Sequence, residues 1–185
     1  MNYFEDGVII AESGDVRIYA VGDIQYLDIG PGHNLWADSD EIKEYHEQIK
    51  DYPRGNCLEI GLGLGVASEY ILRRADFLTT VEINPDIIEA WQQINNPNPK
   101  HKIICDEGLH FIRSTEDTYD FIFFDFYTEL DEDSLPIIEE YYVEVEKILR
   151  PGGDILAWFD IYTPEEIVEN IPDSVRRILN GDKNR

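Results

Sequence analysis

Basic residues, cysteines and long apolar runs are all scarce in this chain of 185 residues. Only 15 Lys and Arg stand against 39 Asp and Glu, and the formal net charge is -24. This charge disfavours nucleic acid as a partner, because each phosphate contact needs a cation. No run approaches the ~20 apolar residues of a membrane span, so no membrane segment is expected. The N-terminus lacks the pattern of a secretion signal, which favours a cytoplasmic location.

Cys57 and Cys105 are the two cysteines of the chain. Both fall at expected strand positions, and we interpret them as buried core thiols in a reducing compartment. No second Cys or His lies near either one at metal-ligand spacing, so no metal site is expected. The chain does have an apolar content of 43% and the length of one domain. Together these predict a globular fold with a substantial core.

From residue 56 onward, apolar runs typical of strands alternate with helical patterns. We expect strands at 57–60, 78–83, 102–105, 119–125 and 154–159, and helices at 66–74, 85–94, 107–113, 135–149 and 164–170. Continuous apolar strands, such as the one through residues 121–124, predict burial on both faces. The fold class is therefore α/β and Rossmann-like: a mostly parallel sheet with helices on both faces.

The first 50 residues have a different pattern. Two apolar runs, residues 17–21 and 24–28, flank Gly22 and Asp23, which predicts a β-hairpin. A helix is expected over 38–50. We therefore predict an N-terminal hairpin and helix over 1–50, followed by a Rossmann-like unit over 51–185.

The C-terminal end of the expected sheet is short. Residues 149–153 predict a turn into the last strand, and few residues remain beyond it. An uncovered sheet edge is an aggregation risk, so we expect the hairpin or the second subunit of a homodimer to cover it.

Residues 58–65 contain an acid followed by three alternating glycines, Glu59, Gly61, Gly63 and Gly65. Glycines allow tight turns and let backbone N–H groups approach a ligand. The dinucleotide fingerprint has its third glycine one position later, and no Gly-Lys-Ser/Thr follows as in a P-loop. An acid two positions before the first glycine suits a ligand with an ammonium group. The structural alternative is a glycine turn that only lets a strand and a helix pack.

Acidic residues also follow the later strands, and in an open α/β sheet the ligand lies beyond these strand ends. Glu82 is expected to accept hydrogen bonds from both ribose hydroxyls, with Ile83 packing on the adenine. Asp106 and Glu107 are expected to bind the adenine amino group, although Asp106 could also be a helix N-cap. Asp125 ends the most apolar strand and could orient or deprotonate an amine acceptor.

Aromatic residues follow Asp125 directly. Phe126 and Tyr127 are expected to wall the acceptor pocket, because aromatic faces bind sulfonium and ammonium groups. The alternative is that both belong to the core. The acidic charge favours a small cationic or neutral acceptor, or a basic protein partner, unless it serves solubility alone.

These motifs resemble those of two related families. The glycine loop with Glu82 is similar to the first motifs of class I S-adenosylmethionine-dependent methyltransferases. The order of hairpin, Tyr45-His46-Glu47, glycine loop, residues 81–84 and Asp125 resembles the polyamine aminopropyltransferases, the spermidine synthase family, over roughly residues 15–160. The resemblance implies the class I methyltransferase fold, S-adenosylmethionine or its decarboxylated form as cofactor, and Asp125, His46 and Tyr45 as catalytic residues.

Two departures from the aminopropyltransferases concern groups that bind ammonium. Leu64 stands where that family has the Asp that contacts the donor amine. Thr128 stands where it has a polyamine-binding Asp, for which Glu129 could substitute. Each loss removes a charge-assisted bond of about 1.5–3 kcal/mol. The sequence therefore favours methyl transfer to a small amine or cationic acceptor. Aminopropyl transfer, and a non-catalytic acidic binding protein on the same scaffold, remain alternatives.

Overall fold

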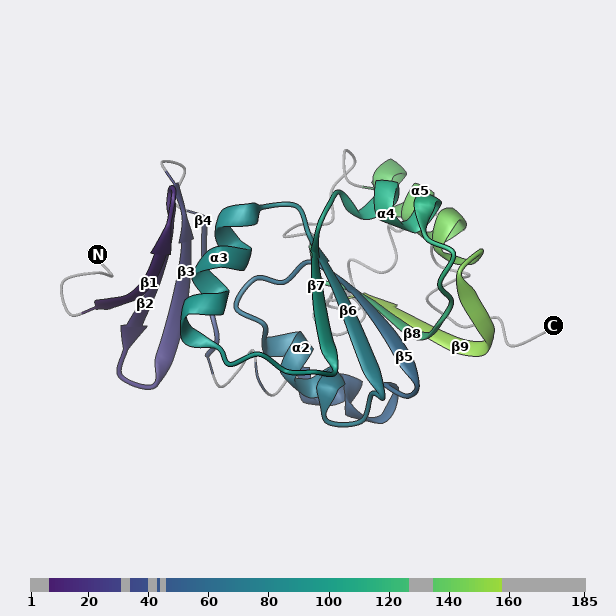
Figure 1. Ribbon diagram of the computed structural model, residues 1–185, viewed down its shortest axis with the longest axis horizontal. Helices are drawn as coiled ribbons and strands as arrows, with labels where there is room; N and C mark the ends of the chain where they lie inside the picture. The colour runs from purple at the N-terminus through teal and green to yellow at the C-terminus, as the bar shows by residue number, and fades with distance from the viewer. Residues whose placement is uncertain (1–6, 31–33, 40–42, 44–45, 127–134, 158–185) are drawn as a thin grey trace, which may run out of the picture.

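Two sheets dominate the computed structural model (Figure 1), which describes residues 7–30, 34–39, 43, 46–126 and 135–157. An antiparallel sheet of four strands is followed in the chain by a parallel sheet of five. None of the helices in these described residues is long and apolar enough to span a membrane.

The N-terminal sheet has the strand order β1-β2-β3-β4. Its strands are β1 (Val8–Ser13), β2 (Val16–Val21), β3 (Ile24–Ile29) and β4 (Asn34–Ala37). The predicted hairpin is confirmed as β2 and β3, and an edge strand extends it on each side. Of the helix expected over 38–50, the structure shows the 3-10 helix η2 (Glu47–Asp51), while residues 40–42, 44 and 45 lie outside the described residues.

The second sheet has the order β7-β6-β5-β8-β9, with every pair parallel. Its strands are β5 (Asn56–Ile60), β6 (Phe77–Glu82), β7 (His101–Cys105), β8 (Tyr119–Phe124) and β9 (Leu149–Ala157). The intervening helices are α2 (Val66–Leu72), α3 (Pro85–Ile94), α4 (Gly108–Ser114) and α5 (Leu135–Val145). The predicted α/β architecture is confirmed; the helix expected at 164–170 lies outside the described residues.

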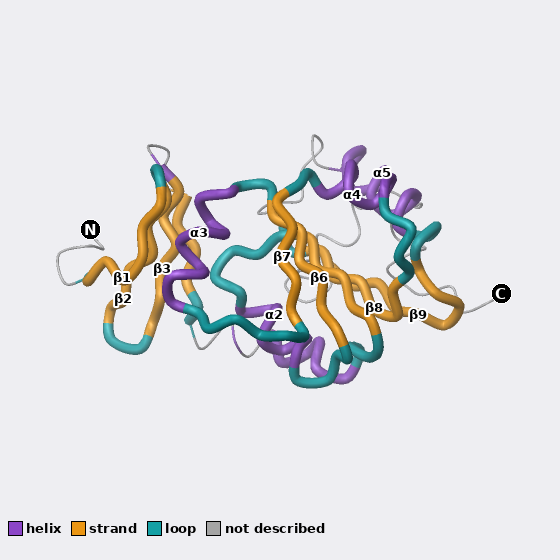
Figure 2. The backbone as a smooth tube through the Cα atoms, in the orientation of Figure 1, coloured by secondary structure: helices purple, strands orange, loops and turns teal. Residues whose placement is uncertain are grey.

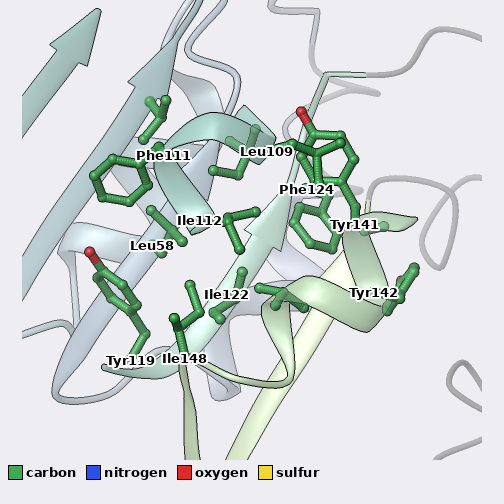
Figure 3. Close-up of a cluster of buried hydrophobic side chains, with 14 of the residues drawn as sticks. Leu58, Leu109, Phe111, Ile112, Tyr119, Ile122, Phe124, Tyr141, Tyr142 and Ile148 are labelled. Atoms are coloured by element: carbon green, nitrogen blue, oxygen red, sulfur yellow. The ribbon is translucent and has the colours of Figure 1, made fainter. Parts of the chain in front are cut away.

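The two faces of the parallel sheet bury different clusters, because successive strand residues point to opposite faces. Leu58 and Ile122 belong to the cluster under α4 and α5, which Figure 3 shows with Phe124 and Tyr141. Phe121 and its same-face neighbours belong to the cluster under α2. Since both faces are covered, the central strands carry apolar residues without alternation.

Helix α3 joins the two sheets. Its buried residues Ile87 and Ala90 pack with Ile18 of β2 in a third apolar cluster. Ser13 Oγ, at the end of β1, donates to Oδ1 of Asp86 at 2.9 Å. Figure 2 places the N-terminal sheet beyond α3, at the opposite end of the molecule from β9. The expectation that the hairpin covers the last strand is therefore wrong.

Two local expectations also differ from the structure. The prediction that Cys105 is buried is wrong, because this residue is exposed at the end of the edge strand β7. Cys57 is buried as expected, and desolvation raises the pKa of its thiol to about 12. The turn expected at 149–153 lies inside β9 as an irregularity, since Tyr119 pairs with Leu149 and Phe121 with Asp154.

We expect Leu58→Ala to lower the free energy of unfolding by about 2–5 kcal/mol, because the fully buried side chain leaves a cavity in the middle of the sheet. Val143→Ala on α5 is the control: Val143 is 60% exposed, and its truncation should change stability by less than about 0.5 kcal/mol. Urea unfolding measures both values. Equal losses in the two variants would contradict the core placement of Leu58.

Candidate active site

A cavity of about 840 Å³ lies at the carboxyl ends of the central parallel strands. One side of its wall comes from the glycine loop after β5 and from the residues that follow β6, β7 and β8. The N-terminal sheet supplies the other side, including Leu27, Ile29 and Trp36. The chain leaves β5 toward β6 on one side and returns to β8 on the other, so the cavity sits at the switch point where such sheets bind ligands. Its volume suits a small ligand.

The three glycines after β5 have different roles. All have positive φ, at 98° for Gly61, 50° for Gly63 and 79° for Gly65. A Cβ on Gly61 would collide with the backbone carbonyl of Asp125, and one on Gly65 with the ring of Trp91. At Gly63 nothing lies within 4 Å of that position. Two glycines therefore allow close packing, while Gly63 leaves bare backbone beside the cavity.

Glu82, the last residue of β6, is hydrogen-bonded to the backbone of the glycine loop. Its Oε2 accepts from the N–H of Leu62 and its Oε1 from the N–H of Asn84, both at 2.9 Å. The side chain is nearly buried, yet it lines the cavity. Each carboxylate oxygen has a second lone pair, so both can accept a further bond from a diol. Ile83, next in the wall, is 67% exposed and offers an apolar surface to a ring.

Asp106 and Glu107 line the cavity after β7 with different partners. Glu107, not Asp106, is the N-cap of α4: it accepts from the N–H groups of Leu109 at 3.0 Å and His110 at 2.8 Å. The alternative expectation of an Asp106 cap is therefore wrong. Asp106 Oδ1 instead lies 2.8 Å from His110 Nδ1, and this hydrogen bond lowers the pKa of Asp106. This pair was not predicted, although its i,i+4 spacing in the sequence is a signal for such a contact.

Asp125 and His46 are far apart in the chain, but both line the cavity and their side chains lie close together. Asp125 Oδ2 lies 3.7 Å from His46 Nε2, and the Asp125 N–H donates to the carbonyl of Ile60 at 2.8 Å. The ring of His46 packs against Phe123 at 6.1 Å and Tyr70 at 6.4 Å between centroids. The Asp125 side chain is 29% exposed, against 5% for His46, so Asp125 is the more accessible of the two.

Glu59 does not reach the cavity wall. It is fully buried on the α2 face of β5, where its Oε2 accepts from Ser68 Oγ at 2.5 Å and from Thr80 Oγ1 at 2.6 Å. Its Oε1 accepts no hydrogen bond from the described residues. Desolvation raises the pKa of Glu59 to about 8. The prediction that Glu59 contacts the ammonium group of a ligand is therefore wrong, because the strand points its side chain away from the cavity.

The remaining predicted residues divide into two groups. Phe126 lines the cavity, and its ring packs on that of Tyr141 with the ring centroids 4.5 Å apart. It therefore contributes both to the cavity wall and to the hydrophobic core. Tyr45, Tyr127 and Glu129 lie outside the described residues. Tyr141 and the wall residues from the N-terminal sheet were not predicted, since no local motif marks them. No cluster of three or more His, Cys, Asp or Glu side chains able to hold a metal occurs in the described part of the chain.

Comparisons with known proteins find similarity to a methyltransferase and to an aminopropyltransferase. No family model matches the chain. It is 35% identical over 80 residues to ribosomal RNA small subunit methyltransferase A of Methylobacillus flagellatus, covering 43% of this chain and 31% of that protein. It is 25% identical over 151 residues to the polyamine aminopropyltransferase of Escherichia fergusonii, covering 74% and 52%.

Solved structures share the architecture. Spermidine synthase in complex with the transition state analogue AdoDATO has a TM-score of 0.66 at 19% identity, covering 93% of this chain and 64% of that one. The N-methyltransferase NodS of Bradyrhizobium japonicum has a TM-score of 0.53 at 23% identity, covering 65% and 68%. The chain has the class I S-adenosylmethionine-dependent methyltransferase fold, near that of spermidine synthase. The chain spans about half, or less, of the length of the two curated relatives named above.

With S-adenosylmethionine as a probe of the cavity, Gly63→Ala should weaken binding by roughly tenfold or more, because the new methyl group enters the cavity beside the loop. Gly22→Ala is a matched control: its φ of 61° is equally strained for alanine and its surroundings equally open, but it lies in the β2–β3 turn. Both variants should lose about 1–2 kcal/mol of stability. Calorimetry measures the affinities. Equal affinities in the two variants would place the ligand elsewhere.

Burial of Glu59 should make stability depend on pH. The folded chain keeps this proton up to about pH 8, whereas the unfolded chain releases it near the ordinary value of 4.5. The folded state therefore binds more protons in this window, and its stability falls as pH rises through it. Relative to Glu59→Gln, the wild-type free energy of unfolding should fall from pH 5 to pH 8 and then level off. Urea titrations across this range measure the difference, and parallel curves would contradict an elevated pKa.

Proposed function

We propose that this chain is an S-adenosylmethionine-dependent transferase that transfers a methyl group to a small amine or other cationic acceptor. The observation that carries this is one cavity at the switch point that combines the open glycine loop, Glu82 and the Asp125–His46 pair. The similarity to methyltransferases and to an aminopropyltransferase supports the same class of reaction.

The donor set suits an adenosyl ligand. Glu82 would accept hydrogen bonds from the two ribose hydroxyl groups, and Ile83 would cover one face of the adenine. Asp106 would accept from the adenine amino group, in competition with His110. Bare backbone at Gly63 allows the close approach that a side chain would prevent. When bound, S-adenosylmethionine supplies an electrophilic carbon on its sulfonium centre.

Asp125 and His46 would handle the proton of the acceptor. An ammonium group cannot act as a nucleophile until it loses a proton, and Asp125 presents the partly exposed carboxylate of the cavity floor. His46, behind it, can take that proton or hold the carboxylate in place. Proton transfer of this kind contributes about 10²–10⁴-fold to a rate. Alignment of donor and acceptor contributes more, up to ~7–11 kcal/mol of the barrier.

The charge of the wall favours aminopropyl transfer as the second candidate. Four carboxylates line the cavity, Glu82, Asp106, Glu107 and Asp125, and its described lining includes no Lys or Arg. Such a wall attracts cations and repels a ligand carboxylate. Decarboxylated S-adenosylmethionine lacks that carboxylate, so this observation supports it even though Leu64 replaces the family's amine-binding Asp. The same charge leads us to propose a small-molecule acceptor in place of nucleic acid.

Calorimetry with S-adenosylmethionine, its decarboxylated form and the two thioether products tests the proposal. Tighter binding of S-adenosylmethionine supports methyl transfer, and tighter binding of the decarboxylated form supports aminopropyl transfer. Thermal shifts provide an independent readout, since a ligand that binds the folded state raises the melting temperature. If none of the four ligands binds or shifts the melting temperature at millimolar concentration, the chain is a non-catalytic acidic binding protein.

Asp125→Asn should lower turnover by about 10²–10⁴-fold while leaving donor affinity within about threefold, because it removes the proton acceptor and keeps the shape. Glu82→Gln should instead lower donor affinity by roughly tenfold or more, through loss of a charged acceptor. Glu116→Gln, an exposed carboxylate outside the cavity wall, is the control and should change neither. A variant of Asp125 that loses affinity but keeps turnover would assign that residue to binding.

A further inference from the structure

Tyr141 of α5 connects two parts of the cavity wall that follow different strands. Its hydroxyl group donates to Oε1 of Glu107, which follows β7, at 2.7 Å. Its ring packs on that of Phe126, the residue directly after Asp125, with the ring centroids 4.5 Å apart. The side chain is 4% exposed and lines the cavity. A single side chain therefore contacts a carboxylate on the β7 side and the aromatic neighbour of Asp125 on the β8 side.

The position of Tyr141 is closely defined by its surroundings. A Cβ on Gly108, the first residue of α4, would lie 2.5 Å from the hydroxyl oxygen of Tyr141 and 2.8 Å from Cγ2 of Ile60. A side chain at Gly108 would therefore have to displace one of these two groups. Tyr141 also meets the ring of Phe124 edge-on, with the centroids 5.6 Å apart (Figure 3). The glycine thus allows the hydroxyl group to reach the beginning of α4.

The hydroxyl group of Tyr141 determines which oxygen of Glu107 is available to a ligand. Oε1 accepts from this hydroxyl group and from the N–H of Leu109, at 2.7 and 3.0 Å. Oε2 accepts one hydrogen bond from the described residues, from the N–H of His110 at 2.8 Å. Each carboxylate oxygen has two lone pairs, so Oε1 is filled while Oε2 can accept one more bond. Because Glu107 lines the cavity, a ligand can supply that donor.

The same hydrogen bonds keep Glu107 ionised. Burial raises the pKa of its carboxyl group, but the bonds from Leu109, Tyr141 and His110 lower it by more, against a small opposing effect of Asp106. The pKa therefore lies below its ordinary value of 4.5. An ionised carboxylate accepts stronger hydrogen bonds than a neutral acid. Tyr141 thus helps to present a charged acceptor in the cavity wall.

We propose that Tyr141 is a positioning residue, which fixes the carboxylate of Glu107 with Oε2 open to a hydrogen-bond donor of the ligand and supports Phe126 beside Asp125. The identity of that ligand rests on the proposed function, in which an N–H group of the nucleoside is the donor. The hydroxyl group serves the nucleoside end of the cavity, and the ring serves the acceptor end. The two contributions can therefore be removed separately.

Titration of Glu107 in ligand-free protein tests the first contribution. Nuclear magnetic resonance of the glutamate carboxyl carbons follows the group, and a Glu107→Gln variant assigns its signal. Tyr141→Phe removes the hydroxyl group and keeps the ring. The midpoint of the Glu107 titration should then move up by about half a pH unit or more, because a donor to the charged form is lost.

Tyr142→Phe is the matched control. This neighbouring tyrosine is 1% exposed and also meets Phe124 edge-on, with the ring centroids 5.4 Å apart. It is not among the described residues of the cavity wall. The control should leave the Glu107 titration unchanged. Equal midpoints in Tyr141→Phe and Tyr142→Phe would overturn the proposal.

Calorimetry and kinetics with the adenosyl compounds separate the two contributions. Tyr141→Phe should weaken binding of the thioether product by about threefold to tenfold and keep turnover at saturating ligand within about twofold. Tyr141→Leu, which also removes the ring beside Phe126, should lower turnover as well. Tyr142→Phe should change neither quantity. Equal affinities in Tyr141→Phe and Tyr142→Phe would show a purely structural role and overturn the proposal.

The outcome is separable from that of the proposed function, because the titration uses no ligand. If the Glu107 midpoint moves in Tyr141→Phe but no adenosyl compound binds the wild type, the role of Tyr141 in fixing Glu107 stands and the transferase assignment fails. If an adenosyl compound binds but Tyr141→Phe matches Tyr142→Phe in both measurements, the transferase assignment stands and the positioning role fails.

Discussion

The contact between the backbone of Gly61 and the carbonyl of Asp125 is the constraint on which the cavity depends. It is available only because Gly61 has no Cβ. The N–H of Gly61 donates to the carbonyl of Val81 at 2.8 Å, and that of Asp125 to Ile60 at the same distance, so three strands end at one place. Glu82 then joins the loop through the Leu62 N–H. A larger separation of β5 and β8 would move the glycine loop away from Asp125.

Local patterns predicted much of this arrangement. Each strand and helix expected between residues 56 and 157 is present, because continuous apolar runs, glycine turns and the Asn84 cap with Pro85 are short-range signals. The parallel topology then requires the strand ends to meet. For that reason the sequence alone assigns the glycine loop, Glu82, Asp106 and Asp125 to one cavity.

The errors have a common physical origin: each depended on which way a side chain points or on what lies beyond its own segment. Glu59 belongs to the correct motif, but the alternation of β5 turns it toward α2. Cys105 is exposed because β7 is an edge strand, which residue type alone does not reveal. The cavity wall from the N-terminal sheet, including Trp36, depends on how that sheet docks on α3. Long-range docking leaves no mark in the spacing of the chain.

Helix α3 has one apolar side against the parallel sheet, through Ile103, and another against β1 and β2, through Ile18. A helix shared in this way cannot lose either neighbour without exposing apolar surface to water. The two sheets therefore share one apolar cluster, despite their different topologies. Separating the two sheets would also remove the wall that Leu27, Ile29 and Trp36 form, so the cavity depends on the docking of the N-terminal sheet.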